Sequence, residues 1–332
     1  MPSRPDLPLV DPQLVAAIAS ADAAIRPSVL ETPVVEWPQY SEHTGGPVWV
    51  KAEHLQRTGS FKLRGATNAV MRAIPRGLTI ATASSGNHGI AVSHALRAAG
   101  KPGVVFLPET VSPSKLEAVR RSGVRVELFG RDSHDTEVEA QRVSAIEGWH
   151  YLSPYNDPDV IAGQGTIGLE LLRQLSQIDV VYVSVGGGGL ISGVAAALKA
   201  RNPDIHIVGC SPANSCVMHE SVRAGRMLEL ESLPTFSDGT AGGVDADAIT
   251  FDYCRTLVDE WLLVSEQEIA RSMRDHIDHL HQLVEGSAGV AFAALLQHAK
   301  SDARFRGATR VAISCGQNIG APRLLEVLAA SG

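Results

Sequence analysis

Short runs of β-branched and apolar residues alternate along this chain with longer stretches of helical periodicity, and few folds accommodate that alternation. The runs predict strands over Val48–Lys51, Thr79–Thr82, Gly103–Leu107, Val124–Leu128, Val180–Ser184, His206–Cys210 and Arg310–Ser314. Helical patterns between them cover Gly89–Ala99, Ser114–Ser122, Thr136–Ile146, Ile167–Gln174, Leu190–Ala200, Gln267–His281 and Ala288–Lys300. Such alternation predicts an α/β protein with parallel sheets and helices on both faces, in which ligands bind outside the carboxyl ends of the strands.

The spacing of these elements suggests two domains. Three compact strand–helix pairs fall within residues 75–155, so we expect a small domain there and a large domain from residues 1–74 and 156–332. Residues 225–247 have weak periodicity and many turn-forming residues, which predicts an irregular connection.

Composition and charge exclude several classes of function. The chain has 332 residues and a net charge of −7, with no long run of one sign, so nucleic acid is disfavoured as a partner. Residues 1–15 carry four prolines instead of the continuous apolar stretch of a signal peptide, and no apolar run is long enough to span a bilayer. The four cysteines form no CxxC pair. We therefore expect a cytoplasmic protein that binds neither membrane nor nucleic acid.

Four consecutive glycines, Gly186 to Gly189, link the predicted strand Val180–Ser184 to the following helix. A tight turn needs only one or two glycines, and four are unfavourable in backbone entropy. Without Cβ atoms, successive N–H groups can converge on an anion at the positive end of the helix. The loop lacks the Gly-Lys-Ser/Thr ending of a nucleotide P-loop, so a triphosphate is disfavoured.

A second glycine motif, Gly163 to Gly168, matches the dinucleotide pattern GxGxxG. A helical segment precedes it in place of a strand, and no acidic residue ends a strand about twenty positions later, as that fingerprint requires. We interpret it as the start of a helix packed closely on a neighbour.

The segment Ser84 to Gly89 joins the predicted strand Thr79–Thr82 to the next helix. Two hydroxyls, an amide, an imidazole and free backbone N–H groups would gather at one helix N-terminus, which suits a carboxylate. An ordinary N-cap needs only one such side chain.

Lys62 lies in the run Ser60–Gly65, between apolar and small residues. Most lysines are solvated surface charges. Desolvation at such a place would instead lower the lysine pKa and leave a neutral amine, the form that attacks an aldehyde or takes a proton from carbon.

Taken in order, the segments Ser60–Gly65, Ser84–Gly89 and Gly186–Gly189 closely resemble one family. The chain looks like the pyridoxal-phosphate-dependent serine/threonine dehydratases and serine racemases of the tryptophan-synthase-β fold type, from about Glu31 to Pro322. The resemblance implies two open, twisted, mostly parallel sheets with helices on both faces, pyridoxal 5'-phosphate as cofactor, and a homodimer.

The resemblance also implies a role for particular residues. Lys62 would carry the cofactor as a Schiff base, Phe61 would flank the ring, and Asn87 would bond the ring hydroxyl. The phosphate would be held by Gly186, Gly187, Gly188 and Gly189. The substrate carboxylate would be bound by Ser84, Ser85, Asn87 and His88.

Residues 313–318 resemble the family's Ser/Cys-Gly-Gly-x-Asn segment, which implies that Cys315 faces the pyridine nitrogen. A thiol is a weak, neutral partner and would leave that nitrogen largely unprotonated. The cofactor would then be a restrained electron sink that favours prompt loss of a β leaving group. A small buried residue at a strand end is the ordinary alternative for a cysteine.

The chain departs from the family pattern at two places that bear on ligands. Many members have Glu-Pro and a nearby Asp that ligate a divalent cation, whereas residues 211–217 contain no carboxylate, so we expect no metal or a weak site. Thr136 stands about where relatives acting on 3-hydroxyaspartate have an arginine, which argues against a second substrate carboxylate.

The resulting hypothesis is a pyridoxal-phosphate-dependent ammonia-lyase that converts a β-hydroxy amino acid to a 2-oxo acid and ammonia. Lys62 would be both the covalent anchor and the base. The substrate could be serine, threonine or a bulkier 3-hydroxy amino acid such as phenylserine. Amino-acid racemisation is the nearest alternative, with Ser85 as the acid/base on the opposite face. β-Replacement is another, and a glycine-rich sugar or nucleotide binding module is the non-enzymatic one.

Overall fold

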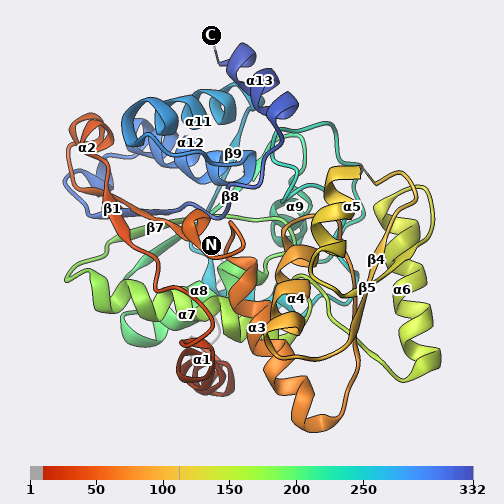
Figure 1. The fold of residues 1–332 in the computed structure, drawn as a ribbon. Helices are drawn as coiled ribbons and strands as arrows, with labels where there is room; N and C mark the ends of the chain where they lie inside the picture. Colours follow the sequence, from red (N-terminus) through yellow and green to blue (C-terminus); the bar gives the residue numbers. More distant parts are fainter. Residues whose placement is uncertain (1–9, 112, 332) are drawn as a thin grey trace.

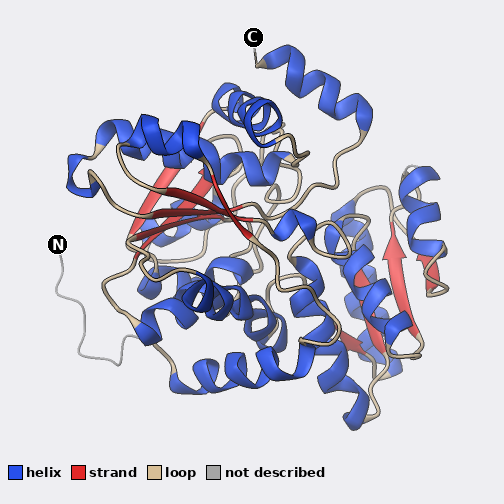
Figure 2. Ribbon diagram, turned by 60° about the vertical axis from the view of Figure 1, so that its left-hand side comes forward, coloured by secondary structure: helices blue, strands red, loops and turns tan. Residues whose placement is uncertain are grey.

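The computed structural model describes residues 10–111 and 113–331. Its larger sheet runs in the order β1 (Val34–Glu36), β2 (Val48–Lys51), β10 (Arg310–Ile313), β7 (Val180–Ser184), β8 (His206–Pro212) and β9 (Glu260–Val264). Its smaller sheet runs β5 (Arg125–Leu128), β4 (Gly103–Leu107), β3 (Ile80–Ala83) and β6 (His150–Tyr151). All neighbouring strands are parallel except β1 with β2. Figure 2 shows the strands of the two sheets as two separate groups. The predicted α/β fold with two mostly parallel sheets is therefore confirmed.

Helices cover both faces of the larger sheet (Figure 1). On one side lie α7 (Pro158–Gln174) and α8 (Gly189–Arg201), against which α1 (Pro12–Ile25) and α10 (Thr250–Leu257) pack. On the other lie α12 (Gly286–Ser301) and, packed on it, α2 (Pro38–Thr44) and α11 (Glu266–Leu280), which in turn contacts α13 (Ala321–Ala330). Helix α9 (Val217–Ala224) packs against α10.

The smaller sheet has α4 (Asn87–Ala98) and α5 (Pro113–Arg120) along one side and α6 (Ser133–Glu147) along the other. Helix α3 (Lys62–Ala73) contacts both α4 and α7, so it connects the helical layers of the two sheets. The smaller sheet falls inside residues 75–155. The division of the chain into domains at residues 74 and 156 stays a prediction.

The seven predicted strands are confirmed, with ends that shift by at most two residues. Three strands were missed. Val34–Glu36 and His150–Tyr151 are too short to show an alternating pattern, and Glu260–Val264 has only one β-branched residue. Six helices were missed as well, including α3, in which Gly65 and Thr67 weaken the helical signal. As expected, residues 225–247 form no helix or strand.

The prediction that residues 163–168 start a helix is wrong, because they lie in the interior of α7. Their close packing is confirmed. A Cβ atom on Gly163 would stand 2.6 Å from the Gly65 Cα atom of α3, and one on Gly193 of α8 would stand 2.3 Å from the Ile161 carbonyl oxygen. Glycine is unfavourable inside a helix by about 1 kcal/mol relative to alanine. Here the contact between helix backbones outweighs that propensity.

Among the residues that the structure describes, none of the helices has both the length and the apolar character needed to cross a lipid bilayer.

We predict that Gly193→Ala lowers the free energy of unfolding by about 1–3 kcal/mol, the usual range for overpacking a dense interior. Gly243→Ala is the control, because a Cβ atom there would have no neighbour within 4 Å. Urea unfolding of both variants measures the difference. Equal midpoints for the two would contradict the close packing of α7 on α8.

Candidate active site

Lys62 is the first residue of α3, which begins at the carboxyl end of the larger sheet. Its amine donates a 2.9 Å hydrogen bond to the Pro154 carbonyl oxygen and lies 5.2 Å from the centre of the Phe61 ring. Desolvation by the surrounding protein lowers the pKa of the Lys62 amine to about 8, although the acidic groups of Cys315 and Glu285 act in the opposite direction. At pH 7 about one tenth of the amine is therefore neutral, against far less for an ordinary lysine.

The backbone on either side of Lys62 is fixed to the segment after β10. Phe61 N–H donates to the Cys315 carbonyl at 3.0 Å, and Ser60 forms an isolated antiparallel bridge with Gly316. Cys315 is buried, and desolvation together with the charge of Glu285 raises the pKa of its thiol well above the usual value. The structure thus brings a protonated, uncharged thiol close to the Lys62 amine.

The tetraglycine loop leads from β7 into α8, and neighbouring residues leave no room for side chains on it. A Cβ atom on Gly187 would stand 2.3 Å from the Tyr155 ring, and one on Gly186 would stand 2.9 Å from the Thr240 backbone. Gly188 has a φ of +85°, which disfavours any other residue. Among the described residues, no peptide N–H of the four glycines donates a hydrogen bond to the protein. These donors are available to an anion at the start of α8.

The segment Ser84 to His88 connects β3 to α4, as predicted. The Ser84 hydroxyl accepts a hydrogen bond from the Gly86 N–H at 3.2 Å. Within the described part of the chain the Ser85 hydroxyl has no hydrogen-bond partner, so it remains available to a ligand. The ring of His88 is buried and forms a 3.1 Å hydrogen bond with the Leu152 carbonyl oxygen. Unlike the Ser85 hydroxyl, it therefore already has a protein partner. Desolvation and the nearby charge of Lys62 lower the pKa of His88 to about 3, so it offers a substrate no positive charge.

Glu285 is a site residue to which the sequence assigned no role. Its two carboxylate oxygens accept from the Asn87 amide at 2.8 and 3.0 Å, and one also accepts from the Asn318 N–H at 3.0 Å. Asn318 in turn donates from its side chain to the Asn87 Oδ1 atom at 2.7 Å. These contacts fix which end of the Asn87 amide is the donor. Burial raises the pKa of Glu285 despite these donors.

Two further residues border the site without having been predicted. Tyr155 packs its ring against Gly187 and accepts a hydrogen bond from the Asp245 N–H at 2.9 Å. Pro154 supplies the carbonyl that holds the Lys62 amine. The run Ser153–Asp157 follows β6. Because that strand has only two residues, its sequence did not predict that the chain after it reaches the site.

Potential metal ligands gather elsewhere. Within the described ranges, Glu260, His298 and Asp302 place ligand atoms within 4.8 Å of one another. The Arg304 guanidinium already forms ion pairs with both carboxylates, so it offsets part of their negative charge without a metal ion. The prediction of an empty or weak metal site at residues 211–217 stays a prediction.

Comparisons with known proteins agree with this geometry. The family model "Pyridoxal-phosphate dependent enzyme" matches residues 25–316. A putative threonine dehydratase of Sinorhizobium fredii is 38% identical over 306 residues, which cover 91% of each chain. An L-threonine ammonia-lyase of Geobacter sulfurreducens is 38% identical over 86% of this chain and 71% of its own length. Among solved structures, tomato threonine deaminase isoform 2 has a TM-score of 0.91 at 32% identity, covering 97% of this chain and 94% of its own.

Maize serine racemase is also similar, with a TM-score of 0.88 at 32% identity over 95% of this chain and 96% of its own. The α/β architecture and the lysine beside a glycine cradle define a cofactor-dependent enzyme of the tryptophan-synthase-β fold type. The chain belongs to the pyridoxal-phosphate-dependent enzymes.

The site fits this cofactor on its own evidence. The tetraglycine loop has free N–H donors where a phosphate would lie, and the lowered pKa of the Lys62 amine suits reaction with a carbonyl. The buried Cys315 thiol offers an uncharged neighbour to a ring nitrogen. The assignment of each of these residues to a part of the cofactor stays a prediction.

We predict that acetic anhydride acetylates Lys62 of the cofactor-free protein with a half-maximum near pH 8, because only the neutral amine reacts and the pKa of Lys62 is lowered to about 8. Mass spectrometry of the Lys62 peptide measures the modification across pH. A free lysine derivative in the same solution is the control, with its ordinary value of 10.5. A half-maximum for Lys62 near that of the control would mean that the amine is fully solvated.

Proposed function

We propose that the protein is an ammonia-lyase that converts L-threonine or L-serine to the corresponding 2-oxo acid and ammonia. The observation that carries the proposal is the pairing of a desolvated lysine amine with an uncharged thiol, held together by the Phe61–Cys315 backbone hydrogen bond. Relatives that are 35–38% identical over most of this chain are named threonine dehydratases or ammonia-lyases, which supports the reaction class.

Pyridoxal phosphate supplies a carbonyl that condenses with amines and a ring that withdraws electrons from bonds at the substrate α-carbon. The chain's own residues do the rest. The N–H groups of Gly186 to Gly189 would hold the phosphate, and Asn87, oriented by Glu285, would bond the ring hydroxyl. The Ser84–His88 turn holds the substrate carboxylate at the start of α4, with His88 contributing its backbone N–H and not its ring.

Lys62 is proposed as the base. Its amine is neutral in an appreciable fraction at neutral pH and takes the proton from the substrate α-carbon. The β-hydroxyl then leaves as water, and hydrolysis returns one water while releasing ammonia, so threonine gives 2-oxobutanoate plus ammonia. The Cys315 thiol stays protonated because burial raises its pKa, so it neither charges the ring nitrogen nor stabilises a long-lived carbanion.

Racemisation is the second candidate function, and one observation favours it. The Ser85 hydroxyl has no partner among the described residues and lies in the turn that would hold the substrate carboxylate, where it could return a proton to the α-carbon. The similarity to maize serine racemase supports testing it. A homodimer in the cytoplasm remains part of the proposal, supported by the family resemblance.

We predict that the protein with pyridoxal phosphate releases ammonia and 2-oxobutanoate from L-threonine, or pyruvate from L-serine. Lys62→Ala should lower the rate by about 10³-fold, within the range for loss of a general base. Lys101→Ala, at an exposed lysine, is the control. A coupled assay of 2-oxo acid release over threonine, serine and phenylserine measures the rates. A Lys62→Ala variant as active as the control would overturn the proposed base.

A separate prediction concerns Ser85→Ala. If Ser85 returns the proton, the ratio of D-serine formation to pyruvate formation should fall at least about tenfold, as for loss of a general acid. Ser122→Ala, in the half-buried turn between α5 and β5, is the control. Chiral chromatography with parallel pyruvate detection measures both products. A ratio that does not change would remove Ser85 from the reaction.

A further inference from the structure

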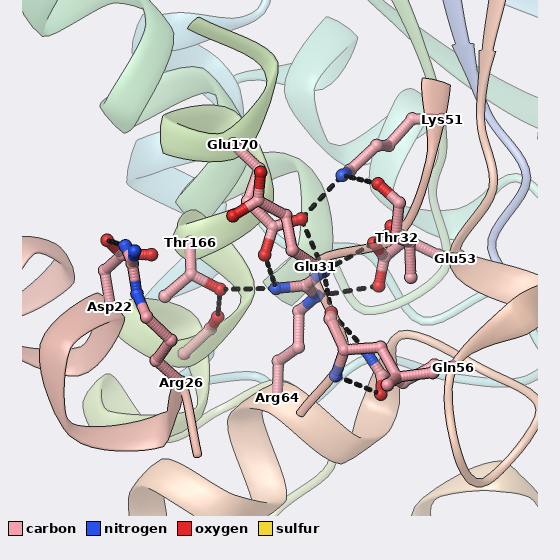
Figure 3. A network of polar contacts seen from close by, with 12 residues as sticks. Asp22, Arg26, Glu31, Thr32, Lys51, Glu53, Gln56, Arg64, Thr166 and Glu170 are labelled. Atoms are coloured by element: carbon pink, nitrogen blue, oxygen red, sulfur yellow. Dashed lines mark hydrogen bonds and ion pairs between the residues drawn. The ribbon is translucent and has the colours of Figure 1, made fainter. Parts of the chain in front are cut away.

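A cluster of four charged side chains is buried beneath the start of α3, between that helix, α7 and the end of β2 (Figure 3). Arg64 is at its centre. Its guanidinium donates to both Glu53 oxygens at 2.7 and 2.8 Å, and to both Glu170 oxygens at 2.6 and 2.8 Å. Lys51 donates to Glu170 at 2.5 Å. The side chains of these four residues are at most 4% exposed.

The cluster is balanced in charge, with two cations and two anions. Burying ion pairs removes hydration that their mutual attraction barely replaces, so stability alone explains such a cluster poorly. What the guanidinium fork does provide is geometry, because two bidentate contacts fix the directions of two carboxylates at once. Arg64 can therefore fix the relative positions of the chain segments that carry its partners.

Arg64 joins three segments that each lead to the active site. It is two residues beyond Lys62 in the first turn of α3. Glu53 lies in the short helix η1 (Glu53–Leu55), and the N–H of the next residue, His54, donates to the Ser314 carbonyl beside Cys315 at 2.9 Å.

The third segment is α7, which carries Glu170. It packs along α8, where a Cβ atom on Gly193 would stand 2.6 Å from the Gly165 nitrogen. Helix α8 itself begins at the tetraglycine loop. One guanidinium thus connects the lysine to the segment beside Cys315 and to the helix that starts at the phosphate cradle.

We propose that Arg64 is a positioning residue for the cofactor lysine, which it holds at a fixed place between the Cys315 segment and the tetraglycine loop through Glu53 and Glu170. This inference rests on the proposed role of Lys62 as the cofactor anchor, and it does not depend on which reaction follows. Lysine in place of Arg64 keeps the charge and loses the fork, so it separates geometry from electrostatics.

The experiment measures equilibrium binding of pyridoxal phosphate, by its visible absorbance, to wild type and to Arg64→Lys. We expect the dissociation constant to rise at least tenfold and the absorbance maximum of the bound cofactor to shift, because the amine no longer meets the carbonyl in one geometry. Urea unfolding of the cofactor-free proteins records the stability of each variant separately.

Lys199→Met is the matched control. It breaks another buried ion pair, with Asp259 at 2.6 Å, in the last turn of α8 and away from the glycine loop. At a comparable decrease in the urea midpoint, this variant should bind the cofactor within about twofold of wild type. If Arg64→Lys and Lys199→Met lose stability alike and both keep the wild-type dissociation constant and absorbance, the proposal is overturned.

A milder variant covers the case in which Arg64→Lys does not fold. Thr166→Val removes the 3.1 Å bond from Arg64 to the Thr166 hydroxyl and leaves the four charges in place. We expect a rise of about threefold in the dissociation constant, and wild-type affinity in this variant would then overturn the proposal. Failure of the proposed ammonia-lyase activity is seen separately, as a wild type that binds the cofactor through Lys62 and releases no ammonia.

Discussion

The chemistry proposed for this site depends on the desolvation of the Lys62 amine. Protein atoms replace water around it, and among the described residues its hydrogen-bond acceptor is the Pro154 carbonyl, which carries no full charge. A carboxylate in that position would have raised the lysine pKa. Glu285, whose charge acts on Lys62, is instead held by hydrogen bonds from Asn87 and Asn318.

The other ionisable groups of the site are also buried, and each is either uncharged or hydrogen-bonded to the protein. Cys315 stays a thiol, His88 stays a neutral imidazole bonded to the Leu152 carbonyl, and Glu285 accepts hydrogen bonds from amides. The charged side chains lie beneath the start of α3, where Arg64 forms ion pairs with Glu53 and Glu170. We expect a site of this kind to bind a charged ligand mainly through backbone N–H groups at helix N-termini, at the tetraglycine loop and at the turn before α4.

Local patterns were enough to predict much of the fold. β-Branched runs identified the central strands, and the tetraglycine loop was conspicuous because no ordinary turn requires it. What the sequence could not supply were contacts between distant segments: Asn87 with Glu285, or Lys62 with Pro154. The GxGxxG run was misplaced for a related reason, since helix propensity argues against glycine inside a helix, and only the packing of α7 on α3 and α8 explains it.

The most direct test of the central claim is to reduce the protein with borohydride in the presence of pyridoxal phosphate and map the modified peptide. The account predicts one modified residue, Lys62, and retention of the cofactor after denaturation. Lys51 is an internal comparison, because it is buried as well but bonded to Glu170. Modification of Lys51 or of a surface lysine with Lys62 left intact, or no stable attachment, would contradict the account.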